Sequence, residues 1–157
     1  MPVKFLAMPT QDARHYQNGG PDAYGNAPVT ATSGGGAIPC RHCLKPVAAG
    51  LDYLILAYRP FGRDQPYAET GPVFLHRQEC VRAGETPFPA PMHARSGRNY
   101  ILRGYRDTDW INYEVAEVVP AERIAETAER MLSRNDVAYL HMRSAEYNCY
   151  QCRIERA

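Results

Sequence analysis

The sequence has no long apolar segment, no marked excess of charge and very little lysine. No stretch of its 157 residues approaches the roughly 18 apolar residues that a membrane-spanning helix needs. The opening residues, MPVKFLAMPTQDARH, contain no apolar run of the kind found in signal peptides. The 18 Lys and Arg residues nearly balance the 17 Asp and Glu residues, so net charge does not indicate nucleic acid as a partner. We therefore expect a cytoplasmic protein that has no membrane partner.

Several common enzyme signatures are also missing. The sequence has no phosphate-binding glycine pattern of the Walker or dinucleotide type, and no serine-centred nucleophile elbow. It has no internal repeat, and its length is that of one ordinary domain. These absences argue against the commonest nucleotide-binding and hydrolase classes. They leave open whether the protein is an enzyme.

Cysteine is the residue type that points to a site. The five cysteines are an odd number, and a reducing cytosol disfavours stable disulfides. Cys40 and Cys43 form a CxxC in PCRHCLKP, and His76 and Cys80 follow in LHRQEC. Three thiolates and one imidazole are a standard closed shell for tetrahedral zinc, with no position left for catalysis. On a helical turn, His76 and Cys80 would share one face. We therefore predict structural zinc at these four residues.

The order of the four residues resembles that of treble-clef zinc fingers, such as those of poly(ADP-ribose) polymerases. In those fingers a CxxC knuckle is followed by a hairpin, and the second pair of ligands enters a helix. Three residues separate His76 from Cys80 here, where those fingers usually have two. The resemblance covers about 40 residues and implies a treble-clef-like zinc element.

Two other interpretations of the cysteines stay open. Closing a loop of about 32 residues costs on the order of 3 kcal/mol, whereas structural zinc contributes roughly 10 kcal/mol or more, so entropy does not exclude the metal. The four residues can instead be ordinary buried or strand-capping side chains. The CxxC can also be a redox pair, but Pro46 and Gly50 follow Cys43 closely, whereas redox dithiols usually begin a helix.

The hydrophobic pattern predicts a single α+β domain over residues 39–157, mainly antiparallel sheet with one principal helix. Residues 17–38 are crowded with Gly, Pro and Asn, so we expect 1–38 to be a loop-rich N-terminal arm. The helix is expected over 121–134, with Pro120 at its favoured first position. Its apolar stripe comprises Ile124, Ala128, Met131 and Leu132. Strands are expected over 3–8, 52–59 (buried on both faces), 73–76, 99–103, 110–119, 137–143 and 150–155.

The last two predicted strands suggest a second site. Strand alternation sends Cys149 and Cys152 to opposite faces, which excludes this pair as a metal or disulfide site. The same alternation, with the apolar sets of the two strands buried together, places His141, Arg143 and Cys149 on the other face. In one allowed register His141 lies opposite Cys149, with Cβ atoms about 5 Å apart.

A thiol beside an imidazole and a guanidinium has a lowered pKa. This face therefore predicts either a nucleophilic Cys149 in a thiol-dependent enzyme, or a site for a small anionic ligand. Arg59, Tyr67 and Glu69 of the preceding loop region are candidates to join it. The alternative is an ordinary solvated strand face that happens to contain a cysteine.

Three segments together resemble the bacterial domain-of-unknown-function family 1203: PCRHCLKP, YRPFGRDQPYAETGPVFLH and LHMRSAEYNCYQCRIERA. The resemblance runs from about residue 39 to the C-terminus, and implies a small single-domain bacterial protein without an established activity. In that family the cysteines at the positions of Cys40 and Cys149 are typical. The resemblance implies that the ligands Cys43, His76 and Cys80 occur only in some members.

Asn148 stands where this family tends to have glycine. Asn accepts a left-handed backbone more readily than other non-glycine residues, so we expect a positive φ there. From the residues and the resemblance together, we expect a non-catalytic or regulatory binding module that is stabilised by structural zinc.

Overall fold

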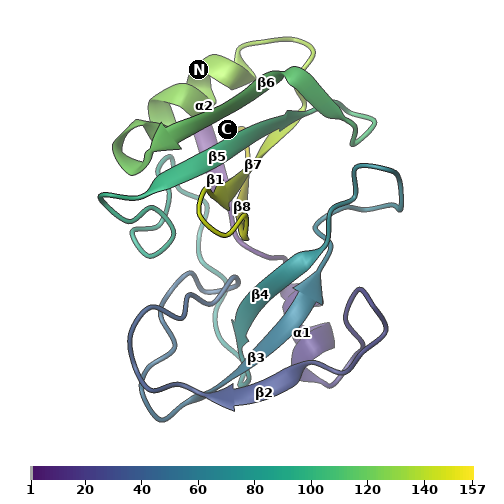
Figure 1. Cartoon of the computed structure of the whole chain (residues 1–157), viewed down its shortest axis with the longest axis vertical. Helices are drawn as coiled ribbons and strands as arrows, with labels where there is room; N and C mark the ends of the chain where they lie inside the picture. Colours follow the sequence, from purple (N-terminus) through teal and green to yellow (C-terminus); the bar gives the residue numbers. More distant parts are fainter. Residues whose placement is uncertain (1) are drawn as a thin grey trace.

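The structure, a computed structural model, describes residues 2–157 and contains two antiparallel sheets, each accompanied by a helix (Figure 1). Met1, the first residue of the expected arm, lies outside the described residues. The predicted α+β class with one principal helix is confirmed. The elements in chain order are β1 (Val3–Leu6), α1 (Thr10–Gln17), β2 (Val29–Thr32), β3 (Asp52–Tyr58), β4 (Gly71–His76), β5 (Asn99–Tyr105), β6 (Ile111–Pro120), η1 (Ala121–Arg123), α2 (Ile124–Leu132), β7 (Tyr139–Ser144) and β8 (Tyr150–Arg156).

The larger sheet has the strand order β1-β8-β7-β5-β6, and α2 packs on one of its faces. The predicted stripe Ile124, Ala128, Met131 and Leu132 is buried against this sheet, as expected. The helical region begins with the 3-10 turn η1, because Pro120 ends β6 and does not open an α-helix. Each large aliphatic side chain buried in such a core contributes about 1.5–3 kcal/mol, so this layer carries much of the stability of the fold.

The smaller sheet has the order β2-β3-β4, and α1 packs beside it (Figure 1). Leu54, Leu56 and Tyr58 of β3 are buried, while the alternate residues are only partly covered. The prediction that 52–59 is buried on both faces is therefore wrong. A three-stranded sheet with one packed face shows the ordinary period-two burial of an antiparallel strand.

The first 38 residues, expected to be a loop-rich arm, contribute three of these elements. β1 pairs with β8 at the edge of the larger sheet, and β2 pairs with β3 in the smaller one. The helix α1 was not predicted, because its sequence TQDARHYQ is polar and buries only Ala13. Among residues 2–157, no helix is long and apolar enough to cross a membrane.

The hairpin of β7 and β8 contains a β-bulge. Leu140 pairs with Ile154 and Met142 with Cys152, which is the predicted parity, but Arg143 then pairs with Tyr150. Gln151 is therefore the extra residue of the bulge.

The bulge moves Tyr150 to the face of His141, and the two ring centroids lie 5.0 Å apart. The predicted opposition of His141 and Cys149 is wrong, because His141 pairs with Arg153. The expected positive φ at Asn148 is confirmed at 56°.

Candidate metal centre

The four predicted zinc ligands meet at one point in the structure. The sulfur atoms of Cys40, Cys43 and Cys80 and a ring nitrogen of His76 all lie within 4.8 Å of one another. The two sulfurs of Cys40 and Cys80 are 3.9 Å apart, and Nδ1 of His76 is 3.4 Å from Sγ of Cys43. A tetrahedron with Zn–S distances of about 2.3 Å has edges of about 3.8 Å. The spacing of the four groups is therefore compatible with a tetrahedral zinc shell.

The turn that carries the two cysteines of the CxxC is held by backbone hydrogen bonds. The amide of Leu44 donates to the carbonyl of Cys40 (2.9 Å), and the amide of Cys40 donates to the carbonyl of Lys45 (3.0 Å). Leu44 has a φ of 57°, a left-handed conformation that is unfavourable for a leucine. The hydrogen bonds of the turn offset this strain. Both sulfurs of the CxxC lie in the same cluster.

The other two ligands are positioned by a strand end and a loop. His76 is the last residue of β4, and residues 77–80 form no helix, so the predicted helical turn is wrong. Helix α1 holds this loop instead. Gln17 donates from Nε2 to the carbonyl of His76 (2.9 Å), and Arg14 donates from Nη2 to the carbonyl of Cys80 (2.9 Å). Sequence reasoning missed both residues because it missed α1.

The ionisation of the three thiols depends on their contact with one another. The hydrogen bond with the Cys43 thiol lowers the pKa of Cys40, and the amide of His76 also donates to its sulfur (3.3 Å). The same hydrogen bond raises the pKa of Cys43, and burial raises the pKa of Cys80. One thiolate therefore makes a second one costly. A divalent cation at the centre would remove this repulsion and favour three thiolates.

A fifth residue, His42, contacts the cluster without belonging to the tetrahedral set. Its side chain is fully buried, and Nδ1 lies 3.1 Å from Sγ of Cys80. The sequence offered a signal for it, since His42 lies inside the CxxC itself. All five cysteines fall within the described residues and are free of disulfides.

The structure separates the residues of the other candidate site. His141 is fully buried, and burial lowers its pKa well below the usual value. Arg143 is also buried, and its Nη2 lies 3.6 Å from a carboxylate oxygen of Glu69. Cys149 is half-buried and precedes β8, on the other side of the bulge. Its sulfur contacts the carbonyl of Tyr147 at 3.8 Å. The imidazole and the thiol therefore do not share one face.

The three loop residues expected to join that site have different partners. Glu69 does reach one residue of that site, Arg143, and it also forms an ion pair with Arg103. Arg59 pairs with Asp64 at 2.8 Å. Tyr67 packs against the exposed Trp110, with ring centroids 5.2 Å apart. Cys152 lies in the core of the larger sheet, whereas Cys149 is half-buried.

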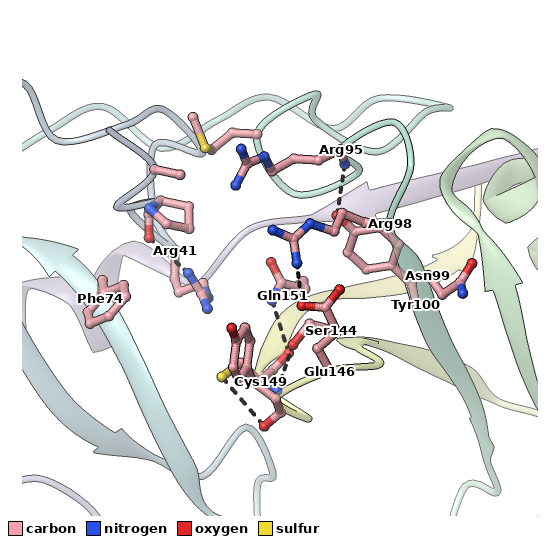
Figure 2. Close-up of a pocket in the computed structure, with 14 residues that line it drawn as sticks. Arg41, Phe74, Arg95, Arg98, Asn99, Tyr100, Ser144, Glu146, Cys149 and Gln151 are labelled. Atoms are coloured by element: carbon pink, nitrogen blue, oxygen red, sulfur yellow. Dashed lines mark hydrogen bonds and ion pairs between the residues drawn. The ribbon is translucent and has the colours of Figure 1, made fainter. Parts of the chain in front are cut away.

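Cys149 lines a pocket that sequence reasoning did not predict (Figure 2). This cavity of about 220 Å³ lies between the CxxC turn and the larger sheet. Its lining includes three arginines from two distant segments, Arg41, Arg95 and Arg98. Arg41 lies between the two cysteines of the CxxC, so the candidate metal centre and the pocket share one turn.

The fold and the cluster define an α+β protein with two antiparallel sheets and a Cys3His set compatible with a metal ion. The chain belongs to the family described as "Protein of unknown function (DUF1203)", which matches residues 37–156. Comparison with curated proteins and with solved structures gave no match.

Proposed function

We propose that the protein is a non-catalytic or regulatory binding module whose smaller sheet is stabilised by structural zinc. The observation that supports this is the convergence of Cys40, Cys43, His76 and Cys80, whose ligand atoms lie within 4.8 Å of one another. The two halves of the set come from segments more than thirty residues apart. Four protein ligands fill a tetrahedral shell, and such a shell serves structure and not catalysis.

The ion would crosslink the CxxC turn to the end of β4 and the loop that follows it, two segments that are also joined by backbone hydrogen bonds, from Arg41 to Phe74 and from Ala83 to His42. The CxxC turn follows a glycine-rich loop, and Cys80 lies in an irregular segment after β4. Structural zinc contributes roughly 10 kcal/mol or more, which is comparable to the total stability of about 5–15 kcal/mol of an ordinary domain. Removal of the ion is therefore expected to loosen or unfold the smaller sheet.

The test is elemental analysis of protein purified without a metal-affinity tag, combined with thermal unfolding. We expect one zinc per chain, a marked fall in melting temperature when a strong chelator removes it, and recovery when zinc is restored. Cys80→Ser is expected to lose the metal. Cys149→Ser is the matched control, since Cys149 is also free but lies outside the cluster. Substoichiometric zinc whose removal leaves the melting temperature unchanged would overturn the proposal.

A further inference from the structure

We propose that the pocket lined by Arg41, Arg95 and Arg98 binds a small organic anion, a carboxylate or phosphate monoester with a compact apolar body. The inference rests on the proposed binding function and not on the metal. Figure 2 shows the three guanidinium groups directed toward the same space, from the CxxC turn and from the loop that precedes β5.

Arg41 is the strongest indication of an anionic ligand. Its side chain is only 3% exposed, yet it forms no ion pair with a carboxylate among residues 2–157. Nε donates to the carbonyl of Tyr150 (2.7 Å) and Nη1 to that of Pro39 (2.8 Å). In the described part of the chain, Nη2 has no hydrogen-bond partner. A guanidinium carries its charge at neutral pH. A buried charge without an opposite charge is costly, and an anion in the pocket would offset that cost.

The other two arginines are exposed at the mouth of the pocket. Arg98 pairs with Glu146, which also lines the pocket, whereas no carboxylate among residues 2–157 pairs with Arg95. Three guanidinium groups therefore face one carboxylate, and the pocket has a net positive charge. Exposed charges of one sign around a cleft attract oppositely charged ligands and speed their association.

The remaining lining defines the size and character of the ligand. Pro39, Phe74, Met92 and Tyr100 give the pocket apolar walls, and Ser144 adds a hydroxyl. The volume of about 220 Å³ is below the range of roughly 300–1,000 Å³ that holds drug-sized molecules. Guanidinium groups bind carboxylates and phosphates through paired hydrogen bonds. Together these features favour one oxyanion attached to a small apolar group.

Besides Glu146, an occupied metal centre would be a source of negative charge near Arg41. Three thiolates around a divalent zinc ion leave a net charge of about −1, and Cys40 precedes Arg41 directly. This charge would offset part of the positive charge of Arg41, whereas Arg95 and Arg98 come from a different segment of the chain. The two exposed arginines are therefore the right positions to change, because their substitution does not disturb the turn.

The test uses the zinc-loaded 157-residue chain and NMR titration with benzoate, phenyl phosphate and the neutral analogue benzamide. We expect saturable shifts with at least one of the two anions at the amides of Tyr100, Ser144 and Gln151, and at least tenfold weaker binding of benzamide. The double variant Arg95→Gln/Arg98→Gln is expected to weaken anion binding by roughly tenfold or more, because each lost charged hydrogen bond contributes substantially. The matched control is Arg123→Gln, an exposed arginine outside the pocket.

The outcomes separate this inference from the zinc proposal when zinc content is measured in every sample. Binding of only one anion supports the inference and identifies the oxyanion. Zinc-loaded protein that shows no saturable shift with either anion overturns the inference and leaves the zinc proposal intact. If benzamide binds as tightly as benzoate, the pocket does not recognise charge and the inference is overturned. The inference is also overturned if Arg123→Gln weakens anion binding as much as the double variant does. Anion binding by protein that takes up no zinc when zinc is supplied supports the inference and overturns the zinc proposal.

Discussion

Nδ1 of His42 lies 3.1 Å from Sγ of Cys80, one of the four residues proposed to hold zinc. Nε2 of the same ring lies 2.9 Å from Oγ1 of Thr10, the first residue of α1. In the tautomer assigned from these contacts, Nδ1–H donates to the sulfur and Nε2 accepts from the hydroxyl. A sulfur that accepts this bond is favoured as a thiolate. A short chain of hydrogen bonds thus connects α1 to the candidate metal centre.

The substitution His42→Phe removes this bond and retains a planar ring. We expect zinc affinity to fall by about 10- to 100-fold, as when other outer partners of metal ligands are lost, while one zinc per chain still binds at saturation. Competition against a chelator of known affinity measures the change. His15→Phe, on the exposed side of α1, is the matched control and should keep the affinity of the parent protein. Unchanged affinity in His42→Phe would contradict a role for the bond.

The pairing of the CxxC with His76 and Cys80 was accessible from the sequence because ligand type and approximate spacing are local properties. The structure brings the same four residues together. The residues that position His76 and Cys80 could not be predicted from the sequence. Arg14 and Gln17 act through α1, which has only one buried residue, Ala13, and therefore no apolar stripe that sequence patterns can detect.

A second prediction concerns the close contact between β5 and β6 at Gly104. A Cβ atom built at this position would lie 2.7 Å from Cγ1 and 2.8 Å from Cβ of Val115, and β5 has a register shift between Arg103 and Tyr105. Gly104→Ala is expected to destabilise the protein by about 1–3 kcal/mol, as overpacking of a core typically does. The melting temperature should fall by roughly 2–4 °C for each kcal/mol. Gly71→Ala, at a strand position with no atom within 4 Å, should leave it nearly unchanged. Equal melting temperatures for the two variants would contradict the prediction.

The strands β7 and β8 show what hydrophobic alternation can predict and what it cannot. Alternation predicted correctly that Leu140 and Met142 share a buried face with Cys152 and Ile154, because burial of one face fixes register parity. Alternation placed Tyr150 on the wrong face, because the bulge at Gln151 cannot be recognised from the hydrophobic pattern of the sequence. The backbone at the bulge is held from afar, by Nε of Arg41, which donates to the carbonyl of Tyr150 at 2.7 Å. A contact across more than one hundred residues is not encoded in local hydrophobicity.

His141 occupies an aromatic cage on that same face of the sheet. Its ring centroid lies 4.8–5.2 Å from those of Phe61, Tyr105, Tyr139 and Tyr150, and both ring nitrogens lack a hydrogen-bond partner within residues 2–157. Burial, and then the positive charges of nearby arginines, lower the pKa of His141 well below its usual value. These arginines are Arg143, Arg153 and Arg103. The imidazole is therefore held neutral in the folded protein over a pH range in which an unfolded chain would protonate it.

The linkage of this pKa to folding gives a third prediction, for His141→Phe. Above about pH 6.5 the ring is neutral in both the folded and the unfolded chain, so it contributes no pH dependence to stability. Below that pH only the unfolded chain takes up the proton. The free energy of unfolding then falls by about 1.4 kcal/mol per pH unit for this one group. The variant keeps the aromatic contacts and removes the titration. Urea unfolding at several pH values between 7.5 and 5.5 should therefore show a stability difference that grows in favour of the variant as the pH falls. Since parent and variant share the four proposed zinc ligands, loss of metal in acid affects both and largely cancels in the difference. Parallel stability curves would contradict the burial of a neutral imidazole at this position.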